Sequence, residues 1–398
     1  MQPKLCIFVS LTKELSRMSR NPKNRLREPI PIPEAAPLPE PEVIDVERIF
    51  QEYVSGAIDL VVVLGPTASG KTRYAVNLAR QLNALAAQVK FGGTAAEGRY
   101  GCERAAAGVV GRSSFAEILS ADSRQVYRGM DIGTGKDMGE YGEIPYHLID
   151  LVPAGARFDL YQWQQAFEKA YADIRTRGGL PILCGGTGLY IQAATCGYAL
   201  SEAPPNPELR AALEQEDVED LREKLAELRP IGAPGETPAD PRTIPYGVLQ
   251  SKRRVIRALE VAFYENEHPA DRSAFLPKKP WFIGTLVSRE DRNARIDRRL
   301  EERLTGRSST GEPVLDAQGK PLTLLDEVRH LLDSGIPYED LVYYGLEYKF
   351  VTQHLLGVLS RDEMKTLLSN AIHQFAKRQM TWFRGMERAG LQIHWTEV

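Results

Sequence analysis

The chain has 398 residues, more than twice the length of a typical domain, so we expect two packed units or one domain with a large insertion. Its 43% hydrophobic and 26% charged residues exclude a fibrous or wholly disordered protein, and no apolar run is long enough for a membrane span. Because the net charge is only -3, any contact with nucleic acid must come from a local basic patch.

The cysteine pattern favours a reducing compartment. The four cysteines have neither CxxC spacing nor a companion histidine cluster, which argues against a structural zinc site. They are Cys6, Cys102, Cys184 and Cys196. The apolar run at residues 5–9 is followed by charged residues without a small-residue cleavage site, so we expect no secretory signal and a cytoplasmic protein.

The N-terminal part of the chain changes character near residue 45. Residues 1–45 predict a disordered tail, because prolines recur through 29–41 and favour an extended conformation. We expect order to begin near Ile58, where the apolar run 58–64 predicts a buried strand. A helix is predicted over 73–82, and the Gly- and Ala-rich residues 84–114 predict a flexible insertion.

Strand and helix patterns alternate in the next part of the chain. The apolar runs 115–121, 146–151 and 180–184 predict strands, and residues 159–175 predict a helix with an aromatic stripe in the core. This alternation predicts an α/β fold, with a parallel sheet flanked by helices and functional residues at the carboxyl ends of the strands. We assign residues 46–200 to the first part of this catalytic core.

The pattern becomes helical after residue 200. Residues 201–275 predict an inserted helical module, with helices over 204–228 and 248–264. A strand at 281–287 returns the chain to the sheet, and helices are predicted from there to the end. Residues 276–398 therefore form the second part of the core, with C-terminal helices.

A phosphate-binding loop follows the first predicted strand. The sequence GPTASGKT fits the pattern GxxxxGK[ST] between a strand and a helix, and it predicts a P-loop NTPase-like core. Backbone N–H groups of such a loop surround a diphosphate, while the lysine adds a cation and the last hydroxyl can bind Mg²⁺. The pattern does not identify ATP as the ligand. The predicted diphosphate-binding residues are Gly65, Pro66, Thr67, Ala68, Ser69, Gly70, Lys71 and Thr72.

Two other predicted strands also end in chemically active side chains. Asp122 ends the second strand, where a carboxylate can hold magnesium or orient a nucleophile. Residues 122–136 combine a carboxylate, amides, hydroxyls and cations, far more than a phosphate cradle requires. Glycines and a hydroxyl at 185–190 repeat the arrangement after another strand.

These motifs together resemble the tRNA dimethylallyltransferase family. The matching segments follow the family's order and cover most of residues 58–398. They are GPTASGKT at 65–72, ADSRQVYRGMDIGTGK at 121–136, PYHLIDLV at 145–152, GGTGLYI at 185–191, RRVIRALEV at 253–261, RIDRR at 295–299 and AKRQMTWFRG at 376–385. The resemblance implies transfer of a dimethylallyl group from dimethylallyl diphosphate to the N6 amine of a tRNA adenine next to the anticodon, with release of diphosphate.

The resemblance also implies roles for individual residues. Asp122 matches the general base, which accepts a proton from the weakly nucleophilic adenine amine. Thr187 matches a residue whose hydroxyl contacts the reacting centre. Arg299 matches the arginine that neutralises the leaving diphosphate, and Arg295 lies one helical turn earlier on the same face. Mg²⁺ bound at Thr72 adds further countercharge.

Several basic and polar segments predict tRNA contacts. Residues 252–257 gather cations on about one and a half helical turns, as phosphate-binding helices do. The target adenine must leave its stack to be modified, and Gln125 and its neighbours are candidates to read it. The predicted tRNA-binding residues are Asp122, Ser123, Arg124, Gln125, Arg210, Arg253, Arg254 and Arg257. A second basic and aromatic patch at 377–388 predicts RNA contact, or packing of Trp382 into the core.

The sequence departs from the family at a few positions. Arg124 stands where an uncharged side chain is usual, Gly135 and Asp137 replace a common Ala and Pro, and residues 344–348 diverge from a Gly-Tyr motif. Because Arg124 lies next to Asp122 and Gln125, its departure concerns base reading and tRNA choice more than phosphate binding.

Simpler interpretations of the same residues also stay open. Asp122 could serve as a cap or a metal contact, and Arg295 and Arg299 could belong to a solvated charged face. Alternative functions are prenylation of a free adenine nucleotide, a small-molecule kinase that uses the loop for ATP, and a non-catalytic RNA-binding protein. The inserted module argues against the first. We expect a monomer that binds tRNA and dimethylallyl diphosphate and does not enter a membrane.

Overall fold

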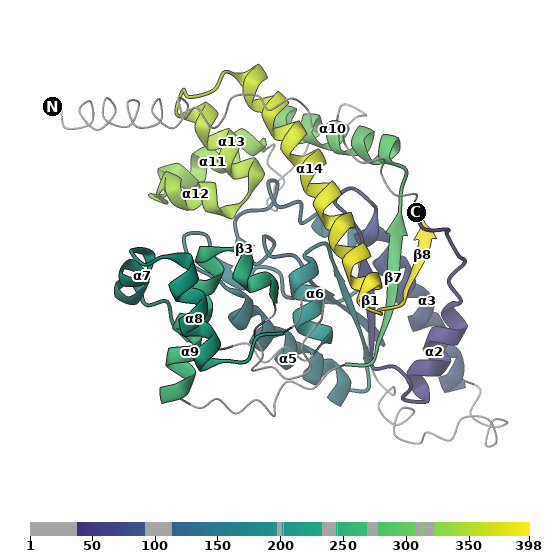
Figure 1. Cartoon of the computed structure of the whole chain (residues 1–398). Coiled ribbons are helices and arrows are strands. Elements are labelled where there is room, and N and C mark those ends of the chain that lie inside the picture. Colours follow the sequence, from purple (N-terminus) through teal and green to yellow (C-terminus); the bar gives the residue numbers. More distant parts are fainter. Residues whose placement is uncertain are drawn as a thin grey trace. The chain divides into compact units, whose positions relative to one another are not determined.

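A parallel β-sheet with helices around it forms the centre of the unit Pro41–Val398 (Figure 1). In the part of the chain that the structure describes, six strands pair in the order β4-β2-β6-β1-β7-β8, and every pairing is parallel. This confirms the predicted α/β class. The strands are β1 (Leu60–Leu64), β2 (Ala116–Ser120), β4 (Tyr146–His147), β6 (Leu180–Gly185), β7 (Pro280–Leu286) and β8 (Ile393–Glu397). A separate short pair joins β3 (Tyr127–Arg128) to β5 (Val152–Pro153).

The structure is a computed structural model that describes residues 38–91, 114–196, 201, 203–232, 244, 246–268, 278–307, 312–313 and 322–398. The chain divides into two units, Met1–Glu40 and Pro41–Val398, and every element named here belongs to the second. The predictions for most of the tail and for residues 92–113 lie outside the described residues. None of the described helices combines the length and apolar character that a bilayer span requires.

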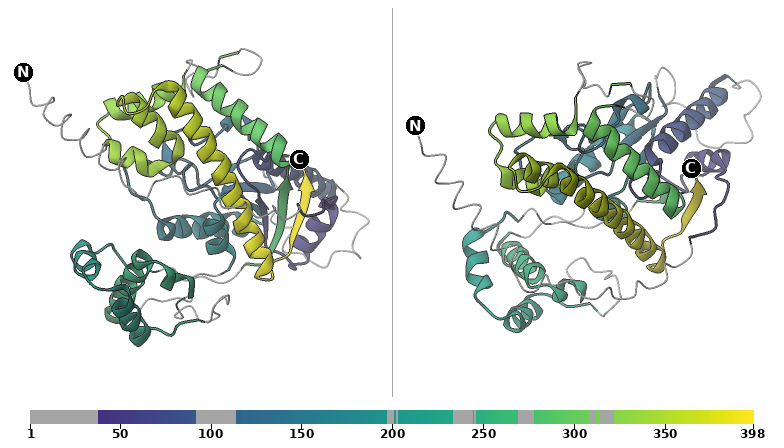
Figure 2. Two further views of the ribbon diagram at one scale, coloured as in Figure 1. Left: turned by 45° about the horizontal axis from the view of Figure 1, so that its top comes forward. Right: turned by 90° about the horizontal axis from the view of Figure 1, so that it is seen from above.

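Helices cover both faces of the sheet, as the fully buried strand β1 requires. Val61 and Val63 point into a core built with α2 (Val46–Val54) and α3 (Lys71–Phe91). Leu60, Val62 and Leu64 point into the opposite core, together with residues of the C-terminal helices and of four helices next to the sheet. These four helices are α5 (Leu160–Thr176), α6 (Gly188–Thr195), α10 (Arg289–Thr305) and α14 (Arg361–Arg388). Figure 2 shows α14 beside α10 in both views.

The aromatic stripe predicted for residues 159–175 is confirmed as core. Trp163 and Phe167 of α5 are fully buried and stack with ring centroids 5.4 Å apart. Tyr171 packs against the same core.

The inserted module has a core of its own. The elements α7 (Pro207–Glu214), α8 (Val218–Leu228), η3 (Tyr246–Gln250) and α9 (Lys252–Glu267) follow the predicted helical regions. Their apolar faces meet in a cluster separate from the two sheet cores. Its buried members are Leu213, Leu221, Leu225, Val255, Ile256 and Leu259.

Four expectations about local structure were wrong. Order begins before Ile58, because Asp45 caps α2 and the backbone N–H of Glu42 donates to the carbonyl of Trp395, so residues 42–45 belong to the core unit. The helix α3 continues through 84–91. The run 146–151 stops being a strand after His147, since Leu148 and Asp150 adopt left-handed conformations. The strand β8 was not predicted, because it is short and pairs only with the distant β7.

The C-terminal helices anchor the polar loop that follows β2. Glu327 of α11 (Leu324–Asp333) is buried, and its carboxylate accepts backbone N–H bonds from Asp131, Ile132 and Gly133 at 2.7 to 3.0 Å. It also accepts the hydroxyl of Tyr348 at 2.6 Å, from α13 (Leu346–Leu355). The short helix α12 (Tyr338–Tyr344) lies between them in the chain. One carboxylate therefore fixes three consecutive residues of the loop.

Replacing this carboxylate by an amide should destabilise the fold. Glu327→Gln keeps the shape of the side chain, but it turns an NH₂ group toward backbone donors. We expect a loss of about 2 kcal/mol or more in the free energy of unfolding, measured by urea denaturation. The matched change Glu339→Gln, on the exposed side of α12, should leave stability within about 0.5 kcal/mol. Equal stability of the two variants would contradict this role for Glu327.

Candidate active site

The carboxyl ends of four neighbouring strands converge on one cavity of about 960 Å³. β1 leads into the phosphate loop, β2 into Asp122, β6 into Thr187, and β7 into α10 with Arg295 and Arg299. All four of these side chains line the cavity, together with Lys71 and Thr72 of the loop. The structure thus brings together the residues that were predicted to act in catalysis and diphosphate binding.

The phosphate loop turns tightly between β1 and α3. Ala68 and Gly70 have positive φ angles of 61° and 79°, an arrangement that directs successive N–H groups to one side. Ser69 is buried and bonds the Thr285 hydroxyl of β7 at 2.7 Å. A Cβ atom on Gly65 would overlap that Thr285 hydroxyl, which explains the glycine. Gly65, Pro66 and Ser69 do not line the cavity, whereas the other predicted members of the loop do.

Lys71, at the end of the loop, lines the cavity. Burial lowers the pKa of Lys71, and the nearby Cys184 and Asp122 oppose that shift. Burial also raises the pKa of Cys184 to about 12, so its thiol is neutral at pH 7. A diphosphate bound at the loop would favour the charged form of Lys71.

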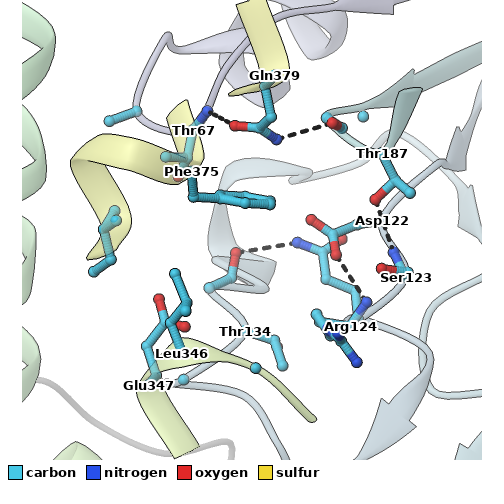
Figure 3. Close-up of a pocket in the computed structure, with 18 of the residues that line it drawn as sticks. Thr67, Asp122, Ser123, Arg124, Thr134, Thr187, Leu346, Glu347, Phe375 and Gln379 are labelled. Carbon is cyan, nitrogen blue, oxygen red and sulfur yellow. Dashed lines mark hydrogen bonds between the residues drawn. The ribbon is translucent and has the colours of Figure 1, made fainter. Parts of the chain in front are cut away.

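Asp122 and Thr187 lie at adjacent strand ends (Figure 3). The Asp122 carboxylate accepts the backbone N–H of Arg124 at 2.8 Å. The Thr187 hydroxyl accepts the N–H of Ser123 at 3.2 Å, which leaves its own proton for another partner. These two bonds fix both side chains relative to the same short loop, on the wall of the cavity.

Gln125 and Lys136, in the same polar loop, have structural partners. The Gln125 amide accepts from the Ser120 hydroxyl and donates to the Gly135 carbonyl. Lys136 is buried and donates to the Tyr127 carbonyl and to two carboxylates. Gln125 lines the cavity, but its amide is also engaged in holding the loop.

Three arginines on one face of α10 form a cationic wall. Arg295, Arg299 and Arg303 are spaced by four residues, and all line the cavity. Arg299 pairs with Asp137, and Arg303 lies 3.8 Å from the Glu347 carboxylate. The adjacent Arg303 and then burial lower the pKa of Arg299, so an anion placed here would relieve repulsion between like charges.

Sequence reasoning missed several members of this site. Arg303 could have been found, because it continues the spacing of Arg295 and Arg299 by one turn. Glu347 lies in the divergent segment 344–348, and burial raises the pKa of its carboxyl group. Gln379 of α14 accepts the backbone N–H of Thr67 and donates to the carbonyl of Gly186, next to Thr187, although its motif was recognised without a role.

The predicted tRNA-binding arginines of the helical module fall into two groups. Arg210 and Arg257 both bind the buried carboxylate of Glu260 inside the helical module, while their side chains remain 43% and 39% exposed. Arg253 and Arg254 lie exposed on α9. Arg210 and Arg257 therefore form ion pairs within the module, in addition to any role toward RNA.

Aromatic side chains also line the cavity. Trp382 is 43% exposed and donates its ring N–H to Gln192, so it is not a core residue, whereas Phe383 is fully buried. Phe375 also lines the cavity and lies 40% exposed (Figure 3). The guanidinium of Arg124 lies over the ring of Tyr343, 5.6 Å from its centre. Arg124, which departs from the family pattern, thus contacts α12, the helix that leads into the divergent segment 344–348.

Comparisons with known proteins agree with this geometry. The profile of the family described as IPP transferase matches residues 125–386. A tRNA dimethylallyltransferase 1 from Porphyromonas gingivalis is 44% identical over 343 residues, which cover 85% of this chain and 94% of that protein. Another protein of that name, from Geotalea daltonii, is 42% identical over 340 residues, with 85% and 91% covered.

Solved structures show the same fold. The crystal structure of a full-length tRNA isopentenylpyrophosphate transferase from Bacillus halodurans matches with a TM-score of 0.52 and 29% identity, over 85% of this chain and 89% of that one. A eukaryotic dimethylallyltransferase acting on tRNA matches in fold, with a TM-score of 0.55 and 19% identity, over 84% of this chain and 73% of that one. The motifs, the fold and the similarity over most of its length show that this chain belongs to the IPP transferase family.

Proposed function

We propose that this chain transfers a dimethylallyl group from dimethylallyl diphosphate to the N6 amine of an adenine next to the anticodon of tRNA, and releases diphosphate. The observation that carries this proposal is the convergence of a phosphate loop, Asp122, Thr187 and Arg299 on one cavity. The family to which the chain belongs and the names of its relatives support the same activity.

The diphosphate lies against the phosphate loop and the cationic wall. The backbone N–H groups of Ala68 and of residues 70–72, together with the Lys71 ammonium, hold it on one side, and Arg295 and Arg299 face it from α10. The N–H of Thr67 donates to Gln379 and that of Ser69 to the Pro66 carbonyl. Breaking the bond between the allylic carbon and oxygen leaves negative charge on the diphosphate. Cations fixed beforehand in a partly enclosed cavity stabilise that charge more than water would.

The acceptor amine meets Asp122 and Thr187. The lone pair of the adenine amine is delocalised into the ring, so attack is easier when a carboxylate takes the amine proton. The backbone bond from Arg124 orients the Asp122 carboxylate for this task. Thr187 keeps a hydroxyl proton that it can donate to an oxygen of the leaving diphosphate at the reacting centre.

The residues present fit a magnesium ion at Thr72. Its hydroxyl and Asp122 line the cavity beside the phosphate loop. No cluster of three or more His, Cys, Asp or Glu side chains that could hold a metal occurs in the described ranges. An ion that takes most of its ligands from diphosphate oxygens and water is typical of Mg²⁺. When bound, it supplies additional positive charge to the leaving diphosphate.

The tRNA contacts the helical module and the mouth of the cavity. Arg253 and Arg254 bind its phosphates, and Arg210 and Arg257 present further charge from the same module. Ser123, Arg124 and Gln125 lie where an extruded base enters. We further propose that the protein acts as a monomer in the cytoplasm, where its free thiols Cys184 and Cys196 remain reduced.

A product assay tests this function directly. Purified protein is incubated with magnesium, labelled dimethylallyl diphosphate and unmodified tRNA, and the tRNA is digested to nucleosides. We expect labelled isopentenyladenosine. Label on free adenine nucleotide alone, or consumption of ATP without use of the allylic diphosphate, would support the alternative functions instead.

Removing the proton acceptor should affect chemistry rather than binding. Asp122→Asn keeps an oxygen for the Arg124 N–H but no longer accepts the amine proton, so we expect kcat to fall by about 10²–10⁴-fold. The tRNA Kd should stay within about twofold. Asp173→Asn, a matched change on the exposed side of α5, should keep normal turnover. Normal turnover of Asp122→Asn would remove the assigned role.

The exposed arginines of α9 should control the salt dependence of tRNA binding. Replacing both Arg253 and Arg254 by Ala removes up to two phosphate contacts, so the Kd should rise and the slope of log K against log salt should flatten by about one to two. Filter binding at several salt concentrations measures both quantities. Arg48→Ala on α2 serves as the control, and an unchanged slope in the double variant would place the RNA contact elsewhere.

A further inference from the structure

Gln379 of α14 joins the two loops that hold the reacting groups. Its side-chain oxygen accepts the backbone N–H of Thr67 at 2.8 Å, and its NH₂ group donates to the carbonyl of Gly186 at 2.8 Å (Figure 3). The first bond fixes the phosphate loop after β1, and the second fixes the loop after β6, next to Thr187. Gln379 itself is 8% exposed.

Both ends of the amide are needed for this contact. One loop presents a donor and the other presents an acceptor, so the bridging group must accept at one atom and donate at the other. A glutamate of the same length would accept from Thr67 but would turn an oxygen toward the Gly186 carbonyl. A methionine would keep the length and lose both bonds.

The space between the two loops has no room for a side chain at Gly186. A Cβ atom on Gly186 would overlap the Gln379 amide and would lie 3.3 Å from the carbonyl oxygen of Gly65. The amide therefore fills the narrow space between the ends of β1 and β6. Any change in its bonding must shift Thr67, Gly186 or both.

We propose that Gln379 is a positioning residue that sets the distance between the diphosphate cradle and Thr187. This inference rests on the proposed function. The allylic carbon is attached to the diphosphate, so its place relative to Thr187 and Asp122 depends on how the two loops are spaced. Through Gln379, α14 determines this spacing from a position about 310 residues away along the chain.

Steady-state kinetics of Gln379→Glu test the inference. We expect the KM for dimethylallyl diphosphate to rise about tenfold or more, because the cradle loses its fixed position. At saturating dimethylallyl diphosphate, kcat should also fall, because the allylic carbon is misplaced. The tRNA Kd should stay within about twofold. The control is Gln374→Glu, the same chemical change at an exposed position of the same helix, which should keep both constants.

A second variant separates positioning from folding. Gln379→Met buries no charge, and it should raise the KM for dimethylallyl diphosphate to a similar extent with a melting temperature close to that of the wild type. An unchanged KM in both variants overturns the inference, even when kcat falls or the protein melts earlier. Absence of isopentenyladenosine with the wild-type chain would instead overturn the proposed function and, with it, the inference.

Discussion

A parallel sheet buried on both faces brings the ends of its strands to one edge, and the candidate site depends on this alignment. β1, β2, β6 and β7 are neighbours, although they are far apart in the sequence. β1 leads into the backbone donors of the phosphate loop, and β2 leads into the Asp122 carboxylate. β6 leads into the Thr187 hydroxyl, and β7 leads into the arginines of α10. None of these elements forms the cavity alone, so the chemistry depends on the hydrophobic burial that holds the strands in register.

The sequence was informative where a site is local. The phosphate loop lies within eight residues, and Asp122 and Thr187 directly follow apolar strands, so their placement follows from the alternation of strand and helix. Family resemblance then assigned roles that no spacing could give. The helical module was also predictable, because its helices show the amphipathic period.

Contacts between distant segments could not be predicted in this way. Glu327 binds a loop almost two hundred residues earlier, and Gln379 binds the phosphate loop across most of the chain. A buried glutamate or glutamine looks like any polar helix residue until its partners are known. For the same reason, the sequence indicated a cationic RNA-binding side chain at Arg210, while its bond to Glu260 emerged only from the packing of α7 on α9. The pairing of Arg257 with the same Glu260 is local, because the two residues lie three apart on α9.

The helical module has a hydrophobic core that is distinct from those of the sheet. We therefore expect substitutions in this core to change the packing of α7, α8 and α9, and to have little effect on the spacing of the strand ends. Under the proposed function, such an arrangement would let the RNA-binding surface change with little effect on the site of prenyl transfer. If the module binds tRNA as proposed, its exchange between two members of the family would be expected to alter tRNA choice.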